Sequence, residues 1–326
     1  MWYCHRRVGT TVISSLPLVY AIGPQTLTKR QTDMSDELEQ TLAQHRLTHV
    51  VRFSPEQIAI LAHATQLGEE ALARTLLPLA QQKSQTPVSG FAVGAIAISG
   101  SGYWYLGANM EMAGQPLSTA LHAEQSAIGH AALCDERYIE KVIVSVSPCG
   151  HCRQFMHELN QDDLMLVLPD QHFTLSELLP HAFGPADLQQ TYGMLNGPAG
   201  NLAAANNPEV DPHDALMLLA LDEANASYAP YSKNRAGVAL QLSDGQICRG
   251  RYLENAAFNP SLSPMQLALS QLFLLGYQPQ DIERAFIVEA TAKVQQAAAA
   301  KQLLASISDV KLETAQFGDT NVKSEE

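Results

Sequence analysis

The chain has 326 residues, 46% of them hydrophobic and 16% charged, an ordinary globular balance that is enough for two medium domains or one large one. Its 20 Lys and Arg against 33 Asp and Glu give a net charge of −13 without any basic run, which argues against a nucleic acid partner because such partners are bound through clustered cations. Five cysteines are few and odd in number for a disulfide-built secreted domain, and no apolar stretch reaches the roughly 18 residues that cross a membrane, so we expect a cytoplasmic protein without membrane partners.

The first 33 residues are expected to lie outside the folded domains. Arg6 and Arg7 precede an apolar stretch, as in a signal peptide, but Pro17 interrupts that stretch and no small-residue cleavage site follows it. Met34 opens a segment that is typical of a natural start. We therefore interpret residues 1–33 as a leader or extension that is disordered or not native, with a targeting segment as the alternative.

Residues 34–85 are predicted to form a small helical segment, because apolar side chains recur there at helical spacing after the start signal Ser54-Pro55-Glu56. The period then changes to that of a β-hairpin, with strands at residues 91–98 and 103–106. A helix is expected to begin near His122. The next expected elements are a strand at 141–146, a helix at 148–159 and a strand at 164–168. This alternation is typical of a layered α/β domain.

Residues 190–212 are rich in Gly, Asn, Pro and Ala and are the best candidate for a linker. Beyond this linker the pattern of the first half begins again. The expected elements are a helix at 214–225, strands at 237–242 and 246–252, a helix at 264–275 and a strand at 285–289.

Two pairs of similar segments indicate that one domain has been duplicated. Pro87–Ala95 resembles Pro230–Val238, and Gly107–Glu111 resembles Gly250–Glu254. The repeat is far too long for a solenoid. The expected limits are 86–189 for a catalytic domain, 213–312 for a degenerate copy and 313–326 for a disordered tail.

The candidate chemistry is carried by two motifs, His122-Ala123-Glu124 and Pro148-Cys149-Gly150-His151-Cys152. A Cys-x-x-Cys pair alone would also fit a thioredoxin-like redox site, but its combination with His-x-Glu is the signature of zinc deaminases. Catalytic zinc takes three protein ligands and keeps a fourth position for water. His122, Cys149 and Cys152 supply three such ligands, and His151 is the alternative fourth one. Both motifs are expected at helix starts, where the helix dipole favours thiolates.

Glu124 is expected to transfer protons rather than to bind the metal. In zinc deaminases the Glu of this motif is the general acid and base. Zinc lowers the pKa of water to about 7, and the carboxyl group of Glu124 would then carry protons to N3 of a pyrimidine and to the departing amine. The alternative interpretation is an ordinary solvated helix residue.

With these motifs the chain resembles the long, homodimeric bacterial form of cytidine deaminase over residues 70–290. The resemblance also rests on four further segments, Gly107–Glu111, Phe155-Met156, Leu179–Pro185 and Tyr228–Lys233. It implies an α/β fold of duplicated three-layer α-β-α domains with mixed sheets, a homodimer, and one Zn²⁺ per subunit. The implied reaction is the hydrolysis of cytidine and 2′-deoxycytidine to uridine and 2′-deoxyuridine with release of ammonia, a step of pyrimidine salvage.

The resemblance also implies a set of substrate-binding residues. Asn109 and Glu111 would bind the ribose hydroxyls, which suits an amide and a carboxylate. The backbone of Ala123 and Ser147 would hold the edge of the base. The implied aromatic contacts are Phe91 against the pyrimidine and Phe183 in the active site of the neighbouring subunit. Core packing of the aromatic residues, and a simple turn at residues 109–111, are the alternatives.

The second half lacks the zinc motifs. At the start of the helix expected after Glu254, the repeat of Glu111, the residues in place of His-x-Glu are Ser263, Pro264 and Met265, and no Pro-Cys-x-x-Cys follows. We therefore expect this half to bind no zinc and to have a structural role, completing the interface.

Two other functions remain open from the sequence. One is a deaminase that acts on a free base, a modified nucleoside or a nucleic acid, which the Asn109 and Glu111 pair and the acidic charge argue against. The other is a non-catalytic zinc protein, which Glu124 and the three-ligand set argue against.

Overall fold

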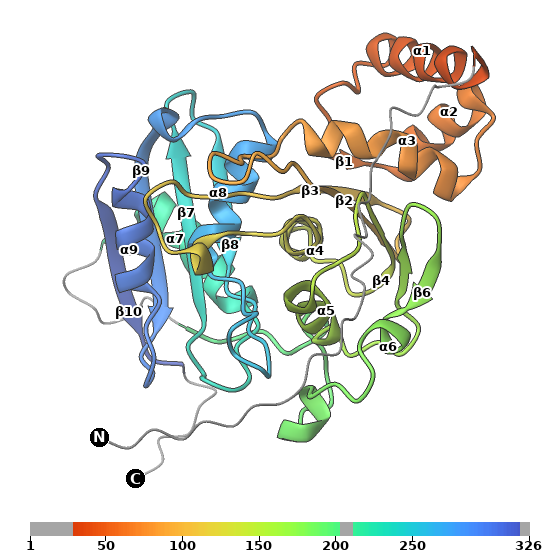
Figure 1. The fold of residues 1–326 in the computed structure, drawn as a ribbon. Coiled ribbons are helices and arrows are strands. Elements are labelled where there is room, and N and C mark those ends of the chain that lie inside the picture. The colour runs from red at the N-terminus through yellow and green to blue at the C-terminus, as the bar shows by residue number, and fades with distance from the viewer. Residues whose placement is uncertain (1–28, 203–210, 320–326) are drawn as a thin grey trace, which may run out of the picture.

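The computed structural model describes residues 29–202 and 211–319, which form two β-sheets with helices on both faces (Figure 1). The elements of the first half are α1 (Lys29–Gln44), β1 (Arg52–Phe53), α2 (Pro55–Thr65), α3 (Glu69–Gln81), β2 (Gly94–Ser99), β3 (Trp104–Ala108), η1 (Leu117–Thr119), α4 (Ala123–Leu133), β4 (Ile139–Val144), α5 (Gly150–His157), β5 (Met165–Val167), β6 (His172–Thr174), α6 (Leu175–Leu178) and η2 (Pro185–Leu188). Those of the second half are α7 (Ala215–Ala226), β7 (Ala236–Leu242), β8 (Ile247–Arg251), α8 (Pro264–Leu274), η3 (Pro279–Asp281), β9 (Ile282–Ala290), α9 (Ala297–Ala305) and β10 (Leu312–Phe317).

The two sheets share one topology, which supports a duplication. The strand order is β1-β3-β2-β4-β5-β6 in the first sheet and β8-β7-β9-β10 in the second, so that β8, β7, β9 and β10 correspond to β3, β2, β4 and β5. The pairs β4–β5 and β9–β10 are parallel. The other corresponding pairs, β2–β3 with β7–β8 and β2–β4 with β7–β9, are antiparallel. The first strand of each hairpin also carries a register shift at its end, between Ile98 and Ser99 and between Gln241 and Leu242. The expected mixed α/β fold is confirmed.

Each sheet is sandwiched between helices because its strands alternate their side chains. In β2, Ala95 and Ala97 pack in the core that contains α4, whereas Ile96 and Ile98 pack in a second core with α2 and α3. In the second half, Val238 of β7 belongs to the core of α8. The cores of α4 and α8 are one continuous cluster, so these two helices join the two halves.

The α4 and α8 helices make reciprocal contacts. The side-chain amide of Gln125 donates to the carbonyl oxygen of Pro260 at 3.1 Å, and that of Gln266 donates to the carbonyl oxygen of Thr119 at 3.0 Å. Each glutamine stands three residues after the N-cap of its own helix, and its acceptor stands three residues before the N-cap of the other helix. The two halves are therefore related by an approximate two-fold axis between these helices.

The structure corrects three limits that the sequence predicted. The strand expected at residues 91–98 begins only at Gly94, after a turn in which Gly90 has a φ of 65°. Helix α1 begins at Lys29, inside the expected leader, of which residues 1–28 lie outside the described part. The expected disordered tail contains β10, which pairs in parallel with β9 and buries Phe317.

None of the helices in the described ranges is both long and apolar enough to span a bilayer.

Candidate active site

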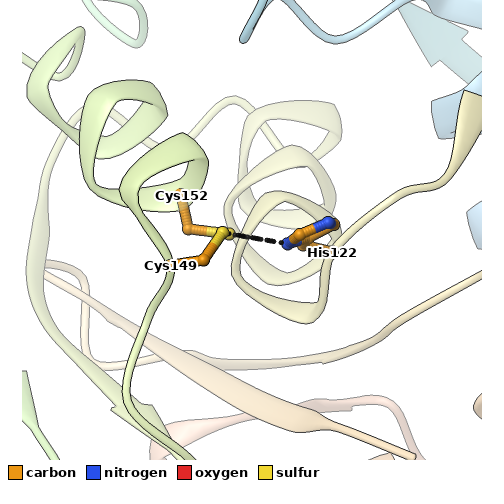
Figure 2. Close-up of side chains that lie close together, drawn as sticks. All are labelled: His122, Cys149 and Cys152. Carbon is orange, nitrogen blue, oxygen red and sulfur yellow. Dashed lines mark hydrogen bonds between the residues drawn. The ribbon is translucent and has the colours of Figure 1, made fainter. Parts of the chain in front are cut away.

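The three expected metal ligands lie together at the starts of two helices (Figure 2). His122 is the N-cap residue of α4, Cys149 is the N-cap residue of α5, and Cys152 lies in the first turns of α5. Nδ1 of His122 is 3.4 Å from Sγ of Cys149 and 3.2 Å from Sγ of Cys152, and the two sulfurs are 3.7 Å apart. A tetrahedral zinc ion needs about 3.8 Å between two sulfur ligands and about 3.6 Å between sulfur and nitrogen, so these residues fit zinc.

The electrostatics of the site favour a thiolate at Cys149, whereas the hydrogen bond with Cys149 and burial raise the pKa of the Cys152 thiol. Hydrogen bonds from the Cys152 thiol and the His122 ring lower the pKa of the Cys149 thiol to about 3. The N-terminus of α5 adds the positive end of a helix dipole beside both sulfurs. Zinc binds cysteine as thiolate, so this environment suits a metal site.

A fourth protein ligand is not found within the described ranges, where the group of possible metal ligands consists of His122, Cys149 and Cys152. His151, the alternative ligand, places its ring 5.5 Å from the ring of His122, centroid to centroid, and does not join the group. A set of three protein ligands leaves one tetrahedral position for water or substrate, which is the pattern of catalytic zinc.

Glu124 is buried beside the ligands. It occupies the second position of α4, its residue is only 4% exposed, and its carboxyl group interacts with the thiol of Cys152. Burial raises the pKa of Glu124, because the charged form loses solvation. A carboxyl group with a raised pKa can both accept and donate a proton near neutral pH.

A cavity of about 300 Å³ opens beside these residues. It collects most of the side chains that the sequence singled out, namely Phe91, Asn109, Glu111, His122, Ala123, Glu124, Ser147 and Cys149. The sequence argument missed other lining residues, among them Ser89, Leu121 and Val146. Cys152 is buried beneath the cavity. Phe183 is not among its lining residues; its side chain is on the surface, 47% exposed.

Asn109 and Glu111 also shape the loop before β2, a role that the sequence did not indicate. The Asn109 side chain accepts a hydrogen bond from the amide of Val93 at 2.8 Å and donates to the carbonyl of Phe91 at 2.9 Å. Glu111 accepts from the backbone amides of Val88 and Ser89, both at 2.9 Å, and from the Ser89 hydroxyl. Partial burial acts in the opposite direction, but these hydrogen bonds lower the pKa of Glu111, which therefore stays a carboxylate.

The corresponding region of the second half is closed by its own side chains. Ser263 caps α8, Met265 is fully buried, and the carboxylate of Glu289 accepts a hydrogen bond from the amide of Gln296 at 2.6 Å at the start of α9. This half thus carries a carboxylate with a local backbone partner near the end of β9, and no cysteine lies at the start of α9. No group of metal ligands occurs in the described part of this half.

Two family models, both described as "Cytidine and deoxycytidylate deaminase zinc-binding region", match residues 68–168 and residues 175–301. The chain is 47% identical over 264 residues to a protein from Aeromonas hydrophila named "Cytidine deaminase", which covers 80% of this chain and 88% of that protein. Proteins of the same name from Aeromonas salmonicida (46% identity, 80% and 88% coverage) and Salmonella arizonae (45% identity, 78% and 86% coverage) are similarly close.

Proposed function

The chain belongs to the family of cytidine and deoxycytidylate deaminases, and from this we infer that it catalyses the zinc-dependent hydrolysis of cytidine and 2′-deoxycytidine to uridine and 2′-deoxyuridine, with release of ammonia, in pyrimidine salvage. One observation carries the inference. The His122, Cys149 and Cys152 ligand set and the buried carboxyl group of Glu124 meet at a single cavity.

The residues of the chain divide the chemistry between them. When bound, zinc supplies the nucleophile by lowering the pKa of water from about 15.7 to about 7. Glu124 accepts the two protons of that water in turn, giving the first to N3 of the pyrimidine and the second to the amine at C4. The oxygen of that water bonds to C4, the C4–N bond breaks, and ammonia leaves as C4 becomes a carbonyl carbon. A buried carboxyl group suits this role because it must gain and lose a proton twice in each turnover.

The cavity favours a nucleoside over a nucleotide. Of the residues described, those that line it include no Lys or Arg, and its permanent negative charge comes from Glu111. A phosphate group would meet repulsion there without a cationic partner. Asn109 and Glu111 offer an amide and a carboxylate, which suit ribose hydroxyls.

The base contacts are proposed from the position of the lining residues. The backbone of Ala123 and Ser147 would hold the polar edge of the pyrimidine, and the ring of Phe91 would pack against its face. Phe91 is 57% exposed, so its ring has an unpacked face for a substrate.

We further propose that the chain forms a homodimer in which Phe183 enters the cavity of the partner subunit. An aromatic side chain that is 47% exposed and does not line the cavity of its own chain supports this arrangement. Light scattering after gel filtration should give twice the chain mass, and Phe183→Ala should raise the KM for cytidine. A monomeric active protein would contradict the proposal.

We propose residues 86–189 as the catalytic domain, and a second domain that begins near residue 213 and has a structural role. The closed region around Met265 and Glu289 supports this division. We also propose the cytoplasm as the compartment, because the cysteines of the described part form no disulfide; they are Cys134, Cys149, Cys152 and Cys248.

The test is ammonia release from cytidine by the zinc-loaded protein. Glu124→Gln should keep one zinc per chain and lose about 10²- to 10⁴-fold in kcat, the usual contribution of a general acid and base. Cytidine monophosphate, cytosine and a cytosine oligonucleotide should react far more slowly than cytidine. If none of these compounds, cytidine included, releases ammonia, the chain is a non-catalytic zinc protein. If another of the compounds reacts faster than cytidine, that compound is the substrate.

A further inference from the structure

Arg153 ties together two backbone segments that border the active site. It lies in α5, directly after the ligand Cys152, and is half-buried. Its Nε donates to the carbonyl oxygen of Pro148 at 2.9 Å, its Nη2 donates to Oγ of Ser147 at 3.3 Å, and its Nη1 donates to the carbonyl oxygen of Leu178 at 2.8 Å. One planar guanidinium group thus serves three acceptors on two segments.

The first of these segments is a wall of the cavity. Val146 and Ser147 line the cavity between the end of β4 and the start of α5. On the strand side this wall is anchored by Ser145, whose amide donates to the carbonyl of Gly94 and whose hydroxyl accepts from the amide of Gly94, both at 3.1 Å. On the helix side its side-chain anchor is Arg153. The amide and carbonyl of Ser147 pair with no other backbone group in the described ranges, so they are available to a substrate.

The second segment leads to Phe183. Leu178, which accepts from Arg153, is five residues before it, and the next residue of α5, Gln154, donates to the carbonyl oxygen of Phe183 at 2.8 Å. One turn of α5 therefore holds both the cavity wall and the segment that carries the exposed aromatic side chain.

We propose that Arg153 is a positioning residue for deamination, which fixes the Ser147-Pro148 wall against the base and the start of the 178–183 segment. The proposal rests on the function inferred above. A lysine could keep the positive charge, but its single ammonium group cannot reach three acceptors spread around a planar fork. The substitution should lower kcat/KM, because small misplacements of groups that orient a substrate cost up to about 10²-fold.

The test compares Arg153→Lys with Arg235→Lys as a matched control. Arg235 is also half-buried and also donates to backbone carbonyl groups, those of Pro198 and Ser227, but it does not line the cavity. We expect kcat/KM for cytidine to fall about 10- to 100-fold in Arg153→Lys, mainly through KM, with one zinc per chain retained. Arg235→Lys should lower the melting temperature about as much as Arg153→Lys does, but it should leave kcat/KM within twofold of the wild-type value.

Equal effects of the two substitutions on kcat/KM, or an Arg153→Lys protein with unchanged kcat/KM, would overturn the proposal. A wild-type protein that does not deaminate cytidine would instead overturn the proposed function.

A second variant keeps the proposal testable if Arg153→Lys does not fold. Ser147→Ala removes one acceptor of the guanidinium and leaves the backbone of the wall in place. It should raise KM by about two- to fivefold, in keeping with the loss of one hydrogen bond to a charged donor that is partly replaced by water. In a double-mutant cycle, Ser147→Ala should add little to Arg153→Lys, whereas independent effects would show that the two side chains do not act together.

Discussion

The close approach of β3 to α4 makes Gly107 a test of how the active site is positioned. A Cβ atom added at Gly107 would lie 2.2 Å from the amide nitrogen of Ala127 and 2.3 Å from the carbonyl oxygen of Ala123, both backbone atoms of α4. Real Cβ contacts essentially never fall below 3.0 Å, so the helix would have to retreat by about 1 Å. Gly107→Ala would therefore move the helix that begins at His122 and carries Glu124.

The second half offers a control of the same geometry. A Cβ atom at Gly250 of β8 would lie 2.0 Å from the carbonyl oxygen of Pro264 in α8, a helix that carries none of the proposed catalytic residues. Each alanine substitution should destabilise the fold by about 1–3 kcal/mol, the usual cost of overpacking. Gly107→Ala should also lose about 10²-fold in kcat/KM, because it misplaces catalytic groups by about 1 Å.

The assay is thermal unfolding together with the kinetics of cytidine deamination and zinc content. The expected result is a similar drop in melting temperature for both variants and a far larger loss of activity in Gly107→Ala, because Gly250→Ala reaches the site only through the contact of Gln266 with Thr119. If both variants lose activity equally, or if Gly107→Ala is fully active, the helix position does not control the site as we argue.

Three further predictions concern His130 of α4, Phe91 of the cavity and the bound zinc. Burial lowers the pKa of His130 to about 4, so the unfolded chain binds a proton first as the pH falls. The free energy of unfolding should therefore fall by about 2 kcal/mol between pH 7 and pH 5. Urea unfolding should show a smaller fall in His130→Leu than in the wild type, and equal falls would contradict this prediction. Phe91→Ala should raise KM about tenfold with little change in melting temperature, because the side chain is 57% exposed, and an unchanged KM would remove Phe91 from the binding site. Removal of zinc by a chelator should abolish deamination and lower the melting temperature, and added zinc should restore both, whereas activity in the metal-free protein would refute the metal's role.

Local patterns were enough to predict much of the fold and the metal site. The hairpin of β2 and β3 has a change of hydrophobic period and a glycine turn, and the helix with the two cysteines follows a proline, Pro148. The ligands His122, Cys149 and Cys152 were recognisable because metal coordination restricts both residue type and spacing.

The parts of the fold and of the site that could not be predicted depend on contacts between residues far apart in the sequence. Strand β10 has exposed polar residues at Thr314 and Gln316 that alternate with buried Ala315 and Phe317, and a short alternation of this kind looks like a polar tail until its partner β9 is known. Arg153 could not be singled out because two of its three acceptors are backbone carbonyls, which every residue carries. Pairings between distant residues therefore had to come from the structure.

The reciprocal contacts of Gln125 and Gln266 limit how far the second half can change. Helix α8 carries none of the proposed catalytic residues, yet its N-terminal glutamine supports the chain just before His122, and the same relation holds in the opposite direction. A substitution at this seam therefore acts on both halves at once.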